Sequence, residues 1–381
     1  MEYKKFSNFI DSVQYGYTAE ETSQTEGDAK YLRITDIVPY FVDKNKVPFC
    51  KIESKNKNKY LVKEDDLLIA RTGATTGYNL IVPCGFDNFI FASYLVRFNY
   101  NKNALYPRYL KHVLKSHQYY GFVKNYIGGS AQPGMNPKAF GKFEIPYIEY
   151  EKQKRIADIL STYDELIENN NKRIKILEQM AENLYKEWFV RFRFPGYKTT
   201  EFENGLPKGW KTKKFIEEFN IIYGKGLPTE DLTFEGYPVF GSNGLIGYYT
   251  RYMYEKPQVL ISCRGASSGV VNISLPCSFI TSNSLICEID ERTETSFEYL
   301  SFALKNYKLT QYQTGSAQPQ ITIDNIRKLK VIIPTNKVIE EFKGFISSIN
   351  EEVLLIKVQN QNLIKQRDML LPRLMSGKLK V

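Results

Sequence analysis

The residue types that usually carry catalysis are sparse in this chain and poorly spaced. The two histidines, His112 and His117, lie five residues apart on a predicted helix and therefore point to different faces. The chain has no H-E-x-x-H or C-x-x-C spacing for zinc, no phosphate-binding G-x-x-x-x-G-K-S/T loop and no G-x-G-x-x-G turn. It also lacks the Asn/Asp-Pro-Pro-aromatic tetrapeptide of amino-methyltransferases, since it contains no Pro-Pro pair. We therefore expect no catalytic residue and no metal site here.

A lysine-rich stretch from 44 to 63 is the first candidate for binding. Glu53 and Lys55, after Asp36 or Asp43, could imitate a nuclease carboxylate–lysine set, but such spacing arises by chance among so many lysines. The same lysines could neutralise phosphates and give a salt-dependent affinity. A solvated loop is the alternative. The candidate residues are Lys44, Lys46, Lys55, Lys57 and Lys59.

A second candidate is a loop of small and hydroxyl residues at 71–77, directly after a predicted strand at 67–70. Such a loop lets backbone N–H groups approach phosphates while an arginine reaches a base edge. A similar loop follows a second predicted strand at 259–262. A tight structural turn would explain the glycines equally well, but it explains the arginines less well. The candidates are Arg71, Thr72, Thr75, Thr76, Arg264, Ser267 and Ser268.

These loops belong to an internal repeat with a period of about 190 residues. The pentapeptide Gly-Ser-Ala-Gln-Pro occurs at 129–133 and again at 315–319, which adds Ser130, Gln132, Ser316 and Gln318 as candidates. In the same order, 68–77 resembles 260–269, Lys4-Lys5-Phe6 resembles 213–215, Tyr15-Gly16 resembles 223–224, and Ile145-Pro146 resembles Ile333-Pro334. The period is too long for a solenoid, so we infer a duplicated domain.

The repeat predicts an α+β fold built from two α/β copies and two long helices. Short β-branched and aromatic runs broken by Gly, Pro and Asn predict strands, and 106–119 and 297–307 read as matching helices. The stretches 150–189 and 336–371 are rich in Glu, Lys, Leu and Ile and predict the long helices. The predicted segments are a first domain (1–148), a central helix (149–190), a linker (191–204), a second domain (205–334), and a C-terminal helix with its tail (335–381).

Both long helices carry a heptad seam, and each seam holds one central asparagine, Asn170 or Asn360. In an antiparallel pair, setting Asn170 opposite Asn360 places the other seam residues opposite one another as well. A lone buried amide costs stability, while a facing pair can satisfy itself and fix the register. We therefore predict an antiparallel coiled coil with a pseudo-twofold relation between the copies, and we expect it to be least regular near Pro372.

Several apolar residues lie outside this seam, and two helices alone cannot cover so wide a stripe. Further helices from a partner could complete a bundle, or the residues could pack against the two domains. Both interpretations remain open. The residues are Ile159, Leu166, Met180, Phe345, Leu354 and Leu355.

The composition is consistent with two domains and a binding function, but it does not by itself establish either. The 381 residues suit about two domains, and 52 Lys+Arg against 42 Asp+Glu give a formal charge of +10. That balance favours a polyanionic partner only weakly, and the 28 Tyr and 24 Phe suit base stacking or simply an AT-rich genome. The chain has no run of 18 apolar residues, no signal-peptide core after Met1, and five cysteines without close pairing. We expect a cytoplasmic protein with reduced thiols.

The repeated pentapeptide, the long helices, the 205–210 restart (Gly-Leu-Pro-Lys-Gly-Trp) and the 371–377 ending (Leu-Pro-Arg-Leu-Met-Ser-Gly) resemble the DNA-specificity subunits of type I restriction–modification systems. The resemblance spans essentially the whole chain. It implies two target-recognition domains, each reading one half of a bipartite double-stranded DNA site. It also implies that the helices set the spacing and dock two modification subunits, with restriction subunits possible in the complex.

The same resemblance places S-adenosylmethionine and catalysis in the modification subunits, so we expect no cofactor in this chain. The two domains differ between 31–37 and 237–244, where the second offers Ser242 and Asn243 as further DNA-binding candidates. Different half-sites are expected from that difference. The alternatives are a non-catalytic protein–protein scaffold of two globules on a coiled coil and, less favoured, a self-sufficient DNA methyltransferase.

Overall fold

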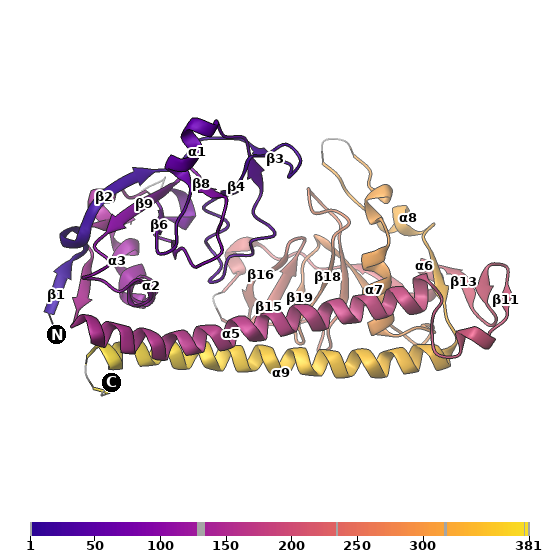
Figure 1. The fold of residues 1–381 in the computed structure, drawn as a ribbon. Helices are drawn as coiled ribbons and strands as arrows, with labels where there is room; N and C mark the ends of the chain where they lie inside the picture. The colour runs from indigo at the N-terminus through magenta and orange to yellow at the C-terminus, as the bar shows by residue number, and fades with distance from the viewer. Residues whose placement is uncertain (1, 128–133, 234, 316–317, 377, 380–381) are drawn as a thin grey trace. The chain divides into compact units, whose positions relative to one another are not determined.

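The structure, a computed structural model, describes residues 2–127, 134–233, 235–315, 318–376 and 378–379. It divides into two compact units (Figure 1). Unit 1 comprises Met1–Lys172 and Lys357–Val381, and unit 2 comprises Arg173–Ile356. Each unit contains one α/β copy with part of both long helices. The division into five segments therefore stays a prediction, because the units cut across the helices.

Unit 1 is built on a four-stranded antiparallel sheet with a second sheet beside it. The first sheet contains, in spatial order, β2 (Ile10–Tyr15), β9 (Leu95–Tyr100), β6 (Leu67–Ala70) and β7 (Asn79–Ile81). The second contains β3 (Glu21–Thr22), β5 (Phe49–Cys50), β4 (Ala29–Leu32) and β8 (Phe89–Phe91). β1 (Glu2–Lys5) pairs with β10 (Glu144–Tyr147). The short helices are η1 (Phe6–Phe9), α1 (Ser54–Tyr60), η2 (Gly73–Thr75), α2 (Pro107–Val113), α3 (His117–Ile127) and α4 (Pro137–Phe140).

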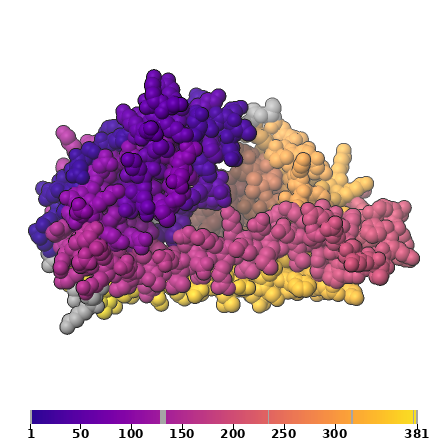
Figure 2. All heavy atoms as spheres, viewed as in Figure 1, coloured from indigo at the N-terminus to yellow at the C-terminus, as the bar shows by residue number. Residues whose placement is uncertain are grey.

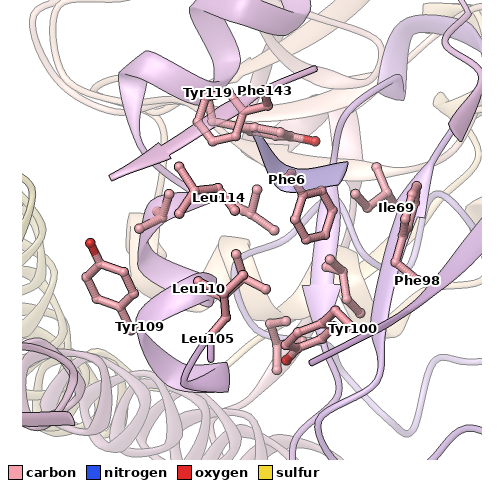
Figure 3. Close-up of a cluster of buried hydrophobic side chains, with 14 of the residues drawn as sticks. Phe6, Ile69, Phe98, Tyr100, Leu105, Tyr109, Leu110, Leu114, Tyr119 and Phe143 are labelled. Carbon is pink, nitrogen blue, oxygen red and sulfur yellow. The ribbon is translucent and has the colours of Figure 1, made fainter. Parts of the chain in front are cut away.

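Strand β6 is apolar at every position because both of its faces are covered. Leu67 and Ile69 pack into the cluster formed with α2 and α3, part of which Figure 3 shows around Phe98 and Leu110. Leu68 belongs to the cluster on the opposite face, with residues of the second sheet. Because successive side chains of a strand alternate between faces, only a strand buried on both sides reads as an unbroken apolar run.

Unit 2 repeats this arrangement with a smaller second sheet. Its main sheet contains β14 (Asn220–Tyr223), β20 (Ser284–Glu288), β17 (Val259–Ser262) and β18 (Val271–Ile273). The second contains β16 (Gly244–Tyr249), β15 (Tyr237–Gly241) and β19 (Phe279–Ile280). Two further pairs are β13 (Lys211–Lys214) with β21 (Lys330–Ile333), and β11 (Phe202–Glu203) with β12 (Leu206–Pro207). The short helices are η4 (Tyr197–Thr199), α6 (Phe215–Glu218), η5 (Thr229–Asp231), α7 (Phe297–Asn306), η6 (Leu309–Tyr312) and α8 (Ile323–Ile326).

The repeated Tyr-Gly pair has a steric cause in both copies. A Cβ atom on Gly16 would lie 2.1 Å from the carbonyl oxygen of Ala92, and one on Gly224 would lie 2.3 Å from that of Thr281. Only glycine allows this backbone approach. One other proposed match is wrong. β1 pairs Lys4 with Ile145 and β13 pairs Lys213 with Val331, so the counterpart of Ile145 is Val331 and not Ile333.

The long helices are α5 (Tyr150–Tyr185), which continues as the π-helical turn η3 (Lys186–Val190), and α9 (Asn336–Met375). They pair antiparallel in both units: Asp164 contacts Arg367 in unit 1, and Arg173 contacts Glu352 in unit 2. The sequence predicts that this helix ends at 371, before Pro372. That boundary is wrong, since α9 continues through Pro372 to Met375. Leu371 and Leu374 are buried in the core of unit 1, which holds this last turn in place.

Candidate nucleic-acid interface

In each unit, the loop after the central strand meets the segment at or directly after the repeated pentapeptide. In unit 2, the N–H of Gly265 donates to the carbonyl of Pro319 over 3.0 Å, and Arg264 bridges to Gln320. In unit 1, Thr72 bridges to Gly134 in the same way, and the N–H of Met135 donates to the carbonyl of Arg71 over 2.9 Å. Segments about 60 residues apart in the sequence thus form one surface, built alike in both copies.

The glycines of these loops are explained by backbone geometry. Gly73 and Gly265 adopt φ values of +73° and +76°, which favour glycine, and a Cβ atom on either would meet nothing within 4 Å. The loop closes when the N–H of Gly77 donates to Ala70 over 2.8 Å. The turn interpretation therefore accounts for the glycines, while the space beside Gly73 and Gly265 stays open to a ligand.

The two loop arginines do not occupy equivalent positions. Arg71 directly follows β6, whereas the residue directly following β17 is Cys263, which is buried. Arg264 corresponds instead to Thr72, as their matching bridges show, and its side chain is exposed. Neighbouring positions on extended backbone point to opposite faces. The copies therefore present positive charge in different directions on a shared scaffold.

Arg71 lies beside two exposed tyrosines, Tyr15 and Tyr94, which were not among the candidates from the sequence. Its guanidinium lies 5.2 Å from the centre of the Tyr15 ring, and its Nε donates to the carbonyl of Ser93 over 3.4 Å. Tyr15 is 50% exposed and the neighbouring Tyr94 is 55% exposed. Stacked arginine and tyrosine planes are a common surface for nucleic-acid bases. The only sequence signal for this group is the repeated Tyr-Gly pair, which marks Tyr15.

The hydroxyl candidates divide by burial. Thr76 and Ser268 are buried, at 5% and 2% exposure, so their side chains support the loops from inside. The Oγ of Ser267 contacts Asn243 Oδ1. The same β15–β16 turn accepts a hydrogen bond from Ser262 at the carbonyl of Ser242. Unit 2 thus brings its loop and this turn into one group.

The remaining candidates of the repeated motifs are placed as follows. Thr72 and Thr75 are half-buried, and Gln318 is exposed. Ser130, Gln132 and Ser316 lie outside the described residues.

The lysine stretch is partly helical, and its lysines differ in availability. Lys44 donates to the carbonyl of Gly85 over 2.8 Å, and Lys57 donates to that of Asp28 over 2.9 Å. Lys55 is exposed but forms an ion pair with Glu53 over 2.9 Å. Lys46 and Lys59 are exposed, so these two are best suited to contact a phosphate.

Arg97, which the sequence did not single out, fixes the helix that carries these lysines. It is buried and forms an ion pair with Asp66 over 3.0 Å. It also donates to the carbonyls of Lys59 and Leu61, each over 2.8 Å, at the C-terminal end of α1. A cation at the last carbonyls of a helix stabilises that end.

The seam asparagines lie opposite one another in unit 1. Asn170 Nδ2 donates to Asn360 Oδ1 over 2.9 Å, and Asn360 Nδ2 donates to Asn171 Oδ1 over 3.0 Å. Both asparagines are buried, so each amide is matched where water is excluded. One heptad farther along α9, the seam is no longer apolar, because Arg367 pairs with buried Asp164.

The apolar residues outside the seam are exposed. Leu166, Phe345, Leu354 and Leu355 are between 48% and 70% exposed, and one side of α5 lies open in the space-filling view (Figure 2). They therefore do not pack against the two α/β copies. Of the two interpretations, packing against the copies does not hold for these four residues, and the added partner stays a prediction.

No group of three or more His, Cys, Asp or Glu side chains among the described residues could hold a metal ion. No helix among the same residues is both long and apolar enough to cross a membrane.

Comparison with known proteins gives one consistent answer. The model of the type I restriction modification DNA specificity domain matches residues 25–179 and again 207–366. The MjaIX specificity subunit of Methanocaldococcus jannaschii is 27% identical, covering 74% of this chain and 71% of that protein. The HindI specificity subunit of Haemophilus influenzae is 22% identical, covering 88% and 92%. The crystal structure of the S subunit from M. genitalium shares the fold, with a TM-score of 0.54 at 17% identity over 98% and 95% of the two chains.

Proposed function

The chain belongs to the type I restriction modification DNA specificity family, and on that premise we propose that each of its two copies reads one half of a bipartite DNA site. The observation that carries this is the surface at the end of each central strand, where the repeated loop meets the segment at or directly after the pentapeptide, beside an arginine. The shared scaffold gives both copies the same way of approaching DNA. The displaced arginines and the different second sheets give them different sequences to read.

The test is selection of binding sites from a random double-stranded DNA library, with the full chain alone and with a modification subunit. We expect one motif made of two fixed blocks separated by a fixed gap. Enrichment of no bipartite motif would overturn the proposal and favour the protein–protein scaffold.

Single substitutions sharpen the test, because the arginines belong to different copies. Arg71→Ala should relax one block and Arg264→Ala the other, each by about 1–3 kcal/mol of discrimination. Replacing Lys46 and Lys59 by methionine should weaken all sequences alike and lower the salt slope by about one per lysine. If either arginine variant changed both blocks equally, assignment of one block to each copy would fail.

We further propose that α5 and α9 set the gap between the two blocks. Both helices run through both units without interruption, so their length is the natural ruler. Inserting one heptad at matched places in both helices adds about 10 Å. The gap should widen by about 3 base pairs while the two blocks keep their sequences. A gap that stayed the same would reject the helices as the ruler.

The exposed apolar residues of α5 and α9 are the proposed docking site for two modification subunits. An apolar stripe of this extent on paired helices suits further helices from a partner. Methylation and S-adenosylmethionine binding then belong to that partner, since this sequence lacks the amino-methyltransferase tetrapeptide. Calorimetry with the chain alone should detect no S-adenosylmethionine binding, whereas the complex should bind it. Binding of S-adenosylmethionine by the isolated chain would instead favour the alternative of a self-sufficient DNA methyltransferase.

A further inference from the structure

Unit 1 contains a cavity of about 370 Å³, and none of its lining residues belongs to the loop surface around Arg71. It lies where α2, α3 and their connection meet the C-terminal part of α9. Lys115 and Arg367 contribute positive charge to its lining, and Leu371 and Met375 contribute apolar surface. The lining also contains Asp368, whose carboxylate pairs with Arg367 over 2.9 Å. Lys115 is therefore the cation of this mainly apolar lining that is left for a ligand.

The one buried carboxylate beside this cavity is fully engaged. Asp164 Oδ2 accepts hydrogen bonds from Tyr40 over 2.8 Å and from Lys111 over 2.6 Å. Its Oδ1 accepts one from Arg367 over 2.7 Å. Three protein donors thus surround a single carboxylate, which leaves it little capacity to neutralise a further cation.

Lys115 is that further cation. Its Nζ donates to the backbone carbonyl of Asn79 over 2.7 Å, and no carboxylate among the described residues lies within ion-pair distance of it. Burial, together with Lys111 and Arg367, lowers the pKa of Lys115 to about 8, so it still carries its charge at pH 7. A half-buried cation that faces a cavity and has no carboxylate partner in the described part of the chain is well placed to bind an anion.

His112, three residues earlier, also lines this cavity and has an unused polar atom. It is 4% exposed, and its Nε2 has no hydrogen-bond partner among the described residues. Burial lowers the pKa of His112 to about 4, so the ring is neutral at pH 7. In the tautomer protonated at Nε2, it could donate one hydrogen bond to a ligand.

In unit 2, the position that corresponds to this cavity is filled by side chains. The copies are matched at Tyr109 and Tyr299, whose hydroxyls donate to the carbonyls of Pro146 and Ile332 over 2.8 Å and 2.7 Å. This match sets Phe302 in the place of His112. There the Phe302 ring stacks on Tyr185, with 6.0 Å between ring centres.

The register of the two long helices shows which residues of unit 2 correspond to the helical wall of the cavity in unit 1. The two seams repeat after 186 residues, so Leu371 and Met375 stand where unit 2 has Tyr185 and Phe189. Two aromatic rings are thus replaced by smaller or more flexible side chains, and a cavity remains. Its shape suits a ring, and its charge suits an anion.

We propose that this cavity binds a small organic anion that carries an aromatic ring, such as an aryl carboxylate or an aryl phosphate. The ring would occupy the volume that Tyr185 and Phe189 fill in unit 2, and the anionic group would lie between Lys115 and His112. The proposal does not depend on which DNA sequence the chain reads. It concerns a site within unit 1 alone.

The experiment uses the full chain with its histidines labelled with carbon-13, because the sequence has only His112 and His117. Phenyl phosphate is titrated while the two imidazole signals are followed by NMR. Inorganic phosphate and benzyl alcohol are titrated as the charged and the aromatic half of the probe. We expect saturable binding of phenyl phosphate with a shift of the His112 signal, and at least tenfold weaker binding of either half alone.

Two variants decide whether the cavity is the site. Lys115→Met removes the cation and should weaken binding of phenyl phosphate at least tenfold. Leu371→Tyr introduces the ring present in unit 2 and should abolish binding while thermal unfolding shows an intact fold. Undiminished binding to Leu371→Tyr, or a wild-type His112 signal that phenyl phosphate leaves unchanged, would overturn the proposal.

Discussion

Asp164 is the residue whose loss should most weaken unit 1. Its carboxylate lies on α5 and holds α9 through Arg367, α2 through Lys111, and the loop before β5 through Tyr40. Asp164→Asn keeps the size of the side chain but removes its charge. The variant therefore leaves two buried or half-buried cations next to a neutral amide.

The magnitude follows from burial. Asp164 is 4% exposed and Arg367 is 7% exposed. Removing one partner of a buried pair costs about 3–5 kcal/mol, because the other charge remains in a medium of low dielectric. The matched control is Arg173→Met, which breaks another ion pair between α5 and α9. That pair, with Glu352, spans 2.9 Å but is half exposed, so its loss should cost less than about 1 kcal/mol.

The assay is urea unfolding at pH 7, followed by circular dichroism for both units and by tryptophan fluorescence for unit 2. Trp188 and Trp210, the two tryptophans of the sequence, both lie in a cluster of unit 2. Asp164→Asn should lower the circular-dichroism midpoint far more than Arg173→Met does. Losses equal within about 1 kcal/mol would show that burial does not set the strength of this ion pair.

The pH dependence of the same variant has a defined sign. Burial raises the pKa of Asp164, but Lys111, His112 and Arg367 outweigh it and hold that pKa below the ordinary value. The stabilisation is therefore complete above the unfolded pKa of about 3.9 and is lost as the pH falls through the lower folded value. The difference between wild type and Asp164→Asn should shrink only below about pH 4. A difference that vanished near neutral pH would contradict this assignment.

Three further outcomes are expected. Burial, Lys111 and Arg367 lower the pKa of His112 to about 4, although Asp164 opposes them. The free energy of unfolding should therefore fall by roughly 3 kcal/mol as the pH drops from about 6.5 to 4. His112→Phe should flatten that slope in urea titrations. Asn360→Ile should cost about 1–3 kcal/mol by removing a partner of the buried Asn170 amide, which would keep only Gln359, and the double variant with Asn170→Ile should recover much of it. Leu355→Glu should weaken pull-down of a modification subunit, whereas Gln361→Glu, at an exposed polar position, should not.

Each of these has a result that would count against it. An unchanged pH slope in His112→Phe would mean that another group binds the proton. A double asparagine variant no more stable than Asn360→Ile would show that the two amides do not depend on each other. Equal loss of docking in the two glutamate variants would point to charge rather than to the apolar stripe.

The duplication, the fold class and the antiparallel helices all follow from the sequence alone. These depend on local periodicity and on order along the chain. The heptad spacing around Asn170 and Asn360 is enough to place apolar residues on one side of each helix, and a repeated run such as 68–77 survives because backbone geometry demands its glycines. The same local signals gave the loop candidates, though not which of them are buried.

Which side chains meet could be seen only in the folded chain. Thr76 and Ser268 turn inward, Arg71 stacks on Tyr15, and Arg71 and Arg264 prove to be one position apart between the copies. Asp164 could not be found from the seam, because its partners come from α2, α9 and a loop far away in sequence. Burial and charge pairing depend on distances between such remote segments, and no periodicity along one segment records them.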